Sequence, residues 1–92
     1  MPEKRAHVFY SGSVQGVGFR FTVSRLAIHH NLSGYVRNLG DGRVEMMLQG
    51  EEKNIFLAIN DIKDNHFSGY IRDTEVQWLE PSKRFTRFEI LF

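Results

Sequence analysis

The sequence contains no cysteine, and it has no long apolar run. The first absence excludes disulfide bonds, thiolate nucleophiles and zinc sites that are built on cysteine. Because of the second absence, no segment is predicted to span a membrane, and no membrane partner is expected. The first ten residues, MPEKRAHVFY, also lack the apolar stretch of a secretory signal peptide. We therefore expect a cytoplasmic protein.

An excess of charge of one sign is lacking too. The 12 Lys and Arg residues nearly balance the 11 Asp and Glu residues, so the formal net charge is +1. A protein that is held to nucleic acid mainly through phosphate contacts carries a broad basic surface, which this composition does not supply. No nucleic-acid partner is therefore expected. The length of 92 residues predicts one domain, and we expect residues 1–92 to form a single free-standing domain and a monomer.

Hydrophobic patterning predicts five strands and two helices. Strands are predicted where β-branched and aromatic residues cluster or apolar residues alternate with polar ones, at residues 7–12, 33–38, 43–50, 70–79 and 85–92. Helices are predicted where apolar residues recur at helical spacing, at residues 19–31 and 51–64. The predicted apolar face of the first consists of Phe19, Val23, Leu26 and Ala27, and that of the second of Ile55, Ile59 and Ile62, with Phe56 and Ala58 alongside. Asn31 tolerates the left-handed conformation that often ends a helix. Asp41 is interpreted as the Asp of an Asp-Gly turn between the second and third strands.

The order of these elements predicts the fold class. The order β-α-β-β-α-β plus a short terminal strand is typical of an α+β, ferredoxin-like split β-α-β sandwich, with two helices on one face of an antiparallel sheet. A right-handed crossover through the first helix then brings the loop after the first strand close to one end of the sheet. On the third strand, Met46 is predicted to lie in the core and Met47 to be half exposed.

The stretch SVQGVGFR, at residues 13–20, places a glycine-containing turn between the first strand and the first helix. Such turns can cradle a phosphate, because backbone N–H groups point inward and the helix N-terminus adds a partial positive charge. Gly16 and Gly18 permit the backbone conformations that this requires, and Arg20 offers a planar fork that matches phosphate oxygens. Composition alone leaves a second interpretation open, in which a glycine turn is followed by a surface arginine.

Two segments together extend this interpretation. GSVQGVGFR at residues 12–20, followed by GYVRNLGDGRVE at residues 34–45, closely resembles the acylphosphatase family, and the final FTRFEILF resembles the family's closing strand. The resemblance implies hydrolysis of small-molecule acyl phosphates, which are carboxyl-phosphate mixed anhydrides, to a carboxylate and inorganic phosphate. It implies Arg20 and Asn38 as catalytic residues, with no metal, no other cofactor and no phosphoenzyme. It also implies a phosphate-binding loop made of Gln15, Gly16, Val17, Gly18, Phe19 and Arg20.

The chemistry of the reaction is compatible with these residue types. A carboxylate can leave without being protonated, so the reaction mainly requires positioning and stabilisation of charge on the phosphoryl oxygens. Arg20 and the loop N–H groups could supply the stabilisation, and the amide of Asn38 could hold a water molecule in line with the leaving oxygen. If the last strand runs beside the site, the C-terminal carboxylate of Phe92 is expected to lie near Arg20.

Two alternatives stay open at this point. One is a phosphate-sensing domain that keeps the fold without turnover, and the other is a nucleic-acid-binding ferredoxin-like module. RNA-recognition modules of this topology stack bases on exposed aromatics of the first and third strands, whereas the predicted third strand, RVEMMLQG, has no aromatic residue. The adjacent His29 and His30 point about 100° apart on a helix and are poor joint metal ligands.

Overall fold

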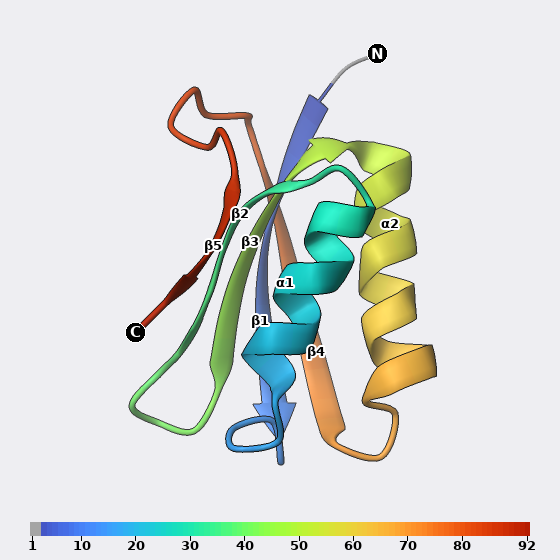
Figure 1. Cartoon of the computed structure of the whole chain (residues 1–92), viewed down its shortest axis with the longest axis vertical. Coiled ribbons are helices and arrows are strands. Elements are labelled where there is room, and N and C mark those ends of the chain that lie inside the picture. Colours follow the sequence, from blue (N-terminus) through green and yellow to red (C-terminus); the bar gives the residue numbers. More distant parts are fainter. Residues whose placement is uncertain (1–2) are drawn as a thin grey trace.

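Residues 3–92 are described by the computed structural model of this chain. Over these residues the elements follow the predicted order, with one additional π-helical turn, η1 (Figure 1). Their bounds are β1 Glu3–Gly12, α1 Phe19–His29, β2 Ser33–Asn38, β3 Val44–Glu51, α2 Glu52–Asp61, η1 Ile62–His66, β4 Ile71–Leu79 and β5 Phe88–Leu91.

The strands form one sheet in the order β4-β1-β3-β2-β5. Neighbouring strands are antiparallel except for β2 and β5, which pair in parallel from Gly34 with Phe88 to Arg37 with Leu91. The ferredoxin-like sandwich is confirmed, but the sheet is mixed rather than antiparallel throughout. The reason is that β4 lies at one edge and β5 at the other, so the chain between them crosses the whole sheet and enters beside β2 in the same direction.

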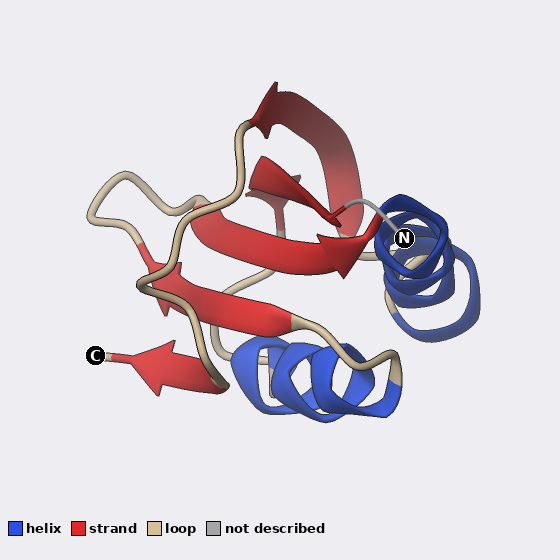
Figure 2. Ribbon diagram, turned by 90° about the horizontal axis from the view of Figure 1, so that it is seen from above, coloured by secondary structure: helices blue, strands red, loops and turns tan. Residues whose placement is uncertain are grey.

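Both helices cover one face of the sheet (Figure 2), and the core lies between these layers. The predicted helical face of α1 is confirmed, because Phe19, Val23 and Ala27 are all buried. On α2 the buried residues are Ile55 and Ala58, as predicted, whereas Phe56, which was expected alongside them, is 48% exposed. Apolar residues at a spacing of three or four share one side of a helix, and their burial against the sheet holds the two layers together.

The outer face of β3, which points away from the helices, departs from the prediction. Met47 was expected to be half exposed, but it is only 6% exposed, and Glu45 and Gln49 are equally buried. The segment 80–87 crosses this face between β4 and β5 and lies beside Met47 and Gln49, whereas Glu45 is covered by His7 and Arg37. The Gln49 side chain exchanges two hydrogen bonds of 2.7 Å with the backbone of Ser82, which lies in that segment.

Several boundaries also differ from those predicted. β1 begins at Glu3 rather than at residue 7, because β3 continues to Glu51 and offers a pairing partner along that length. The second helix ends at Asp61, and the π-helical turn η1 occupies residues that were assigned to the helix end and the following loop. Asn31 has a φ of 60°, which confirms the left-handed conformation expected after α1. Within residues 3–92, no helix is both long and apolar enough to cross a membrane.

Candidate active site

The loop between β1 and α1 has an unusual backbone at its two inner glycines. Gly16 and Gly18 have φ values of 80° and 75°, in the left-handed region that residues with a Cβ rarely adopt. A Cβ built on either glycine meets no atom within 4 Å, so the backbone dihedral and not lack of space demands glycine there. Left-handed residues in a turn direct successive N–H groups into a common concavity, which is the geometry of an anion cradle.

The first turn of α1 adds further unpaired donors. Gly18 is the N-cap residue, and among residues 3–92 no side chain caps the helix N-terminus. The first N–H groups of an α-helix have no partner within the helix, and the aligned peptide dipoles place partial positive charge there. A ligand that accepts hydrogen bonds from the loop would therefore also meet the helix N-terminus.

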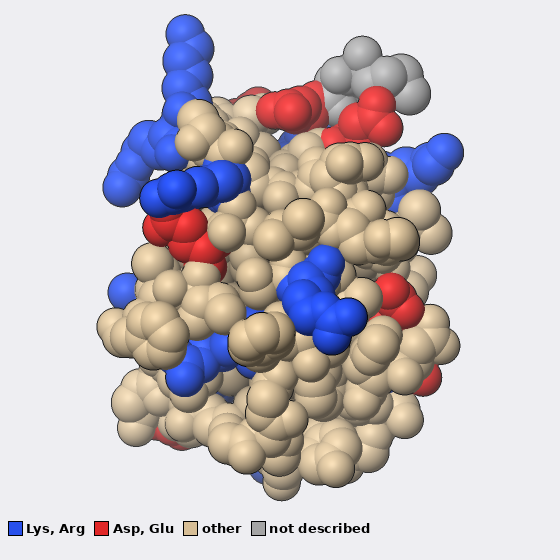
Figure 3. Space-filling view, in the orientation of Figure 1, with Lys and Arg blue, Asp and Glu red and all other residues tan. Residues whose placement is uncertain are grey.

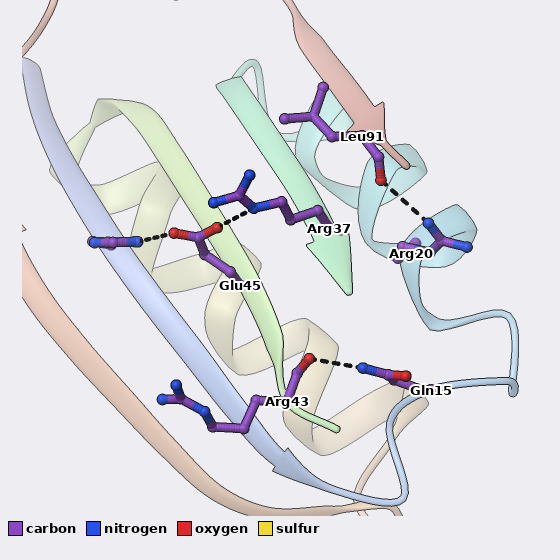
Figure 4. Close-up of polar contacts among 7 residues, drawn as sticks. Gln15, Arg20, Arg37, Arg43, Glu45 and Leu91 are labelled. Carbon is purple, nitrogen blue, oxygen red and sulfur yellow. Dashed lines mark hydrogen bonds and ion pairs between the residues drawn. The ribbon is translucent and has the colours of Figure 1, made fainter. Parts of the chain in front are cut away.

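Arg20 is held over this loop by the last strand. Its Nη1 donates a hydrogen bond to the carbonyl oxygen of Leu91 at 3.2 Å (Figure 4), and its Cζ lies 4.8 Å from the centre of the Phe92 ring. The last strand therefore runs beside the site and brings the ring of Phe92 to Arg20, whereas a contact between Arg20 and the C-terminal carboxylate stays a prediction. Because a guanidinium carries five N–H donors, the bond to Leu91 leaves four for other acceptors.

Asn38 is the last residue of β2 and lies at the same end of the sheet. Its Oδ1 is buried, and it accepts no hydrogen bond from any of residues 3–92. Most buried polar atoms in proteins have a partner, so an acceptor without one is a feature to be explained. A side-chain amide in this state can still accept one hydrogen bond and donate others.

A single pocket of about 190 Å³ unites these features. Of the predicted site residues it is lined by Gly16, Gly18, Phe19, Arg20 and Asn38. The other residues that line it are apolar: Val14, Phe21, Ile90 and Phe92. Of these, only Phe92 was expected near the site from the sequence; Ile90 lies on β5, about 70 residues away along the chain from Arg20, and no motif marked Val14 or Phe21. Val17, which is 40% exposed, is not among the lining residues.

The side chain of Gln15 faces away from this pocket and toward the β2–β3 hairpin. Its Nε2 donates to the carbonyl oxygen of Leu39 at 2.8 Å and to that of Arg43 at 2.9 Å. Figure 4 shows the bond to Arg43. Since Leu39 directly follows Asn38, this contact couples the position of the glycine loop to the end of β2. Both acceptors belong to the backbone of the hairpin, so they could not be identified from sequence patterns.

A buried carboxylate lies on the other face of the sheet. Glu45 Oε2 is 2.6 Å from His7 Nε2, and its Oε1 accepts a 2.6 Å hydrogen bond from Arg37 Nε (Figure 4). Burial acts to raise the pKa of the Glu45 carboxyl, but the hydrogen bonds from His7 and Arg37 outweigh it, so the pKa is lowered. The network ties together β1, β3 and β2, and Arg37 directly precedes Asn38.

Two further titratable residues, Asp41 and His30, make local contacts. Asp41 accepts a hydrogen bond from the Arg43 backbone at 3.1 Å, which fits the predicted turn. His30 Nε2 lies 3.5 Å from Asp61 Oδ2, where it links the end of α1 to α2. Over residues 3–92, no three His, Asp or Glu side chains come together as a possible set of metal ligands.

Fold and pocket define the chain as a ferredoxin-like α+β protein with a glycine-loop pocket between β1, α1, β2 and β5. The acylphosphatase family model matches residues 6–90. An acylphosphatase from Chlorobaculum tepidum is 40% identical over 91 residues, with 99% of each chain covered. The chain belongs to the acylphosphatase family.

Solved structures agree with this assignment. The crystal structure of acylphosphatase from Bacillus subtilis matches with a TM-score of 0.89 and 30% identity, covering 97% of this chain and 99% of that one. The crystal structure of HypF from T. kodakarensis matches with a TM-score of 0.84 and 36% identity over 97% of this chain, which is 12% of that protein. The same fold therefore occurs both as a short chain and within a much longer one.

Proposed function

We propose that this protein hydrolyses acyl phosphates to a carboxylate and inorganic phosphate by direct in-line attack of water. The observation that carries the proposal is the composition of one pocket, in which two left-handed glycines, the Arg20 guanidinium and the Asn38 amide meet. Each of these groups suits a different requirement of phosphoryl transfer, and the family to which the chain belongs has the same activity in its name.

The phosphoryl group is bound by the loop and by Arg20. Backbone N–H groups around Gly16 and Gly18, together with the first turn of α1, donate hydrogen bonds to its oxygens. Arg20 approaches from the side of β5, and its four remaining N–H donors are enough for a bidentate contact. These donors stabilise the charge on the equatorial oxygens in the transition state.

Asn38 positions the attacking water. Its side chain lines the pocket, so its amide can hydrogen-bond the water and orient a lone pair toward phosphorus. The water oxygen forms a bond to phosphorus as the bond from phosphorus to the acyl oxygen breaks. An amide is too weak a base to take the water's proton, which passes to a phosphoryl oxygen. The carboxylate leaves as an anion and needs no proton donor.

We further propose that the backbone N–H groups of Gln15, Val17 and Phe19 belong to the phosphate-binding loop, as the family resemblance implies. Catalysis is proposed to need no metal and no other cofactor. A cytoplasmic location, a monomeric state and a single free-standing domain over residues 1–92 also stay predictions.

The alternative of a nucleic-acid-binding module finds little support. The outer face of β3 presents Glu45, Met47 and Gln49, all of them buried and none aromatic. Base stacking needs exposed aromatic rings on this strand, and the segment 80–87 covers part of the face where bases would lie. A phosphate-sensing domain without turnover is distinguished from an enzyme only by the assay below.

The proposal is tested by the hydrolysis of benzoyl phosphate by the purified protein and two variants. Arg20→Ala should lower kcat/KM by about 10³-fold or more, since removal of a transition-state arginine in phosphoryl transfer has effects of this size. It should also weaken competitive inhibition by inorganic phosphate. Asn38→Ala should abolish measurable turnover but weaken phosphate inhibition only modestly, because its amide binds water rather than phosphate.

Matched controls exist for both variants. Arg25→Ala removes an exposed arginine on α1, and Asn60→Ala removes an exposed asparagine on α2; neither lines the pocket. Both controls should keep wild-type kinetics. Undiminished turnover in Asn38→Ala would rule out water positioning by that residue. A wild-type protein that binds phosphate without hydrolysing any acyl phosphate would be a sensing domain, and activity that disappears with a chelator would contradict metal-free catalysis.

A further inference from the structure

A second, larger pocket lies on the outer face of the sheet, opposite the helices. Its volume is about 340 Å³, which lies in the range of small-molecule sites. We call it the outer pocket. Three arginines and three apolar or aromatic side chains are among the residues that line it: Arg5, Arg84, Arg87, Tyr35, Met47 and Phe85.

Positive charge is concentrated at the outer pocket. The three arginines and a single acidic residue, Glu89, line it, so its formal charge is +2, whereas the whole chain carries only +1. In Figure 3, Lys and Arg side chains gather at the upper left, where Figure 1 places the segment that leads into β5. A hollow lined by one sign of charge raises the local concentration of ions of the opposite sign. The outer pocket therefore attracts anions.

The arginines keep much of their hydrogen-bonding capacity. Nε of Arg5 donates to the carbonyl oxygen of Glu80 at 2.8 Å, and its two Nη groups have no partner among residues 3–92. Nε of Arg87 donates to Glu89 at 2.7 Å, which leaves its Nη groups in the same state. The Arg84 guanidinium makes no hydrogen bond or ion pair with residues 3–92. Two Nη groups form the fork that binds a carboxylate or a phosphate through paired hydrogen bonds.

The rest of the outer pocket favours a ligand with a planar apolar part. The ring centres of Tyr35 and Phe85 are 6.1 Å apart, and Met47, which is 6% exposed, lies beside them in the same lining. Arg5 Cζ is 5.9 Å from the centre of the Phe85 ring. An anion that contacts the guanidinium groups therefore also meets aromatic surface, which a bare inorganic ion does not use.

The outer pocket is separate from the glycine-loop pocket. Glu89 and Leu91 line the outer pocket, whereas Ile90 and Phe92 line the other, because successive side chains of β5 point to opposite faces of the sheet. Exposed arginines alone are common on protein surfaces. Arg25 on α1 is also exposed, but no second arginine lines the pocket beside it.

We propose that the outer pocket is a second ligand site, which binds a small organic anion that carries at least two negative charges and a planar apolar part. The arginines bind its carboxylate or phosphate oxygens, and Tyr35 and Phe85 contact its ring. This inference goes beyond the proposed function and does not depend on it, because neither Arg20 nor Asn38 takes part.

The test is isothermal titration calorimetry with trimesate, a benzene ring that bears three carboxylates, in phosphate-free buffer of low ionic strength. One molecule should bind per chain with a Kd below about 1 mM. Benzoate has the ring but a single charge and should bind at least about tenfold more weakly. Tricarballylate has three carboxylates on an open chain, and the absence of a ring should weaken its binding by about threefold or more.

Variants locate the binding. Arg84→Gln removes a guanidinium that has no partner among residues 3–92, so it should fold normally and bind trimesate about tenfold more weakly. Arg84→Lys keeps the charge without the fork and should recover part of the loss. Arg25→Gln is the matched control, because it removes the same charge from α1, and it should bind trimesate as the wild type does. All three variants should hydrolyse benzoyl phosphate within about twofold of the wild type.

Phenyl phosphate is the organic-phosphate probe. It is titrated into Arg20→Ala, to suppress binding in the glycine loop, and into the double variant with Arg84→Gln. Binding of either probe that Arg84→Gln weakens supports the outer pocket, and the probe that binds more tightly identifies the ligand as a carboxylic acid or an organic phosphate. Equal trimesate affinity in Arg84→Gln and Arg25→Gln, trimesate binding that Arg20→Ala abolishes, or no binding of either probe would overturn the proposal. None of these outcomes changes the result of the benzoyl phosphate assay, which tests the proposed function separately.

Discussion

The link between Gln15 and the β2–β3 hairpin leads to a prediction that can be quantified. Gln15→Leu keeps the approximate size of the side chain and removes both hydrogen bonds from Nε2, to Leu39 and to Arg43. The two carbonyl acceptors do not become unpaired. The Leu39 N–H still donates to the Arg43 carbonyl at 2.8 Å, and the Gly42 N–H lies 3.3 Å from the Leu39 carbonyl.

The loss of stability expected for Gln15→Leu follows from this geometry. Each neutral hydrogen bond contributes about 0.5–1.5 kcal/mol net, and no additional penalty for an orphaned acceptor applies here. Gln15→Leu should therefore reduce the free energy of unfolding by about 2 kcal/mol, which lowers Tm by roughly 8–16 °C for a domain of this size. The glycine loop also loses its connection to the residue after Asn38. If the loop then shifts by about 1 Å relative to Asn38, kcat should fall by about 10- to 100-fold, because the reacting groups are no longer aligned.

Urea denaturation measures the stability change, with an unchanged m-value as evidence that the unfolding reaction is the same. Gln77→Leu is the matched control, because Gln77 is exposed on the edge strand β4 and its side chain makes no hydrogen bond with residues 3–92. It should stay within about 0.5 kcal/mol of the wild type. Gln15→Glu is isosteric but places a carboxylate against two carbonyl oxygens, so at pH 7 it should destabilise at least as much as Gln15→Leu.

The reasoning would be refuted by a Gln15→Leu variant whose unfolding free energy equals that of Gln77→Leu. It would also be refuted by a stable Gln15→Glu variant at pH 7, since that result would show that the side chain does not act as a donor to the hairpin. If Gln15→Leu loses stability but keeps its kcat, Gln15 stabilises the fold and does not contribute to catalysis.

Two further predictions concern the loop backbone and the buried carboxylate. Gly18→Ala should cost about 1–2 kcal/mol because it forces a Cβ into a left-handed conformation, whereas Gly40→Ala, at a residue without positive φ and with open space around it, should be neutral or slightly stabilising in thermal unfolding. Equal Tm changes in the two variants would contradict the strain argument. The pKa of Glu45 is lowered in the folded state, so its contribution to stability is present above the unfolded pKa of about 4.3 and is lost as pH falls through the folded pKa. The difference in unfolding free energy between the wild type and Glu45→Gln, measured by urea denaturation from pH 7 to pH 3, should therefore shrink below about pH 4. A difference that does not change with pH would exclude a stabilising role for the ionised Glu45 carboxylate.

The sequence by itself determined the local structure of this protein. Helical spacing identified the buried face of α1, with Phe19, Val23 and Ala27, because that spacing reflects the geometry of a single turn. Glycine at positions 16 and 18 signalled a left-handed turn, since few other residues adopt it. The two segments that carry Arg20 and Asn38 also identified the family, which the comparisons confirm.

Only the tertiary structure determined which distant residues come into contact with these segments. Burial of Met47 depended on the segment 80–87 crossing the outer face of the sheet, and the parallel pairing of β5 with β2 placed Leu91 and Phe92 against Arg20. Local patterns report the conformation of a few consecutive residues. Contacts between residues about 70 positions apart depend instead on the order of strands in the sheet, so the apolar part of the pocket emerged only when the strands were assembled.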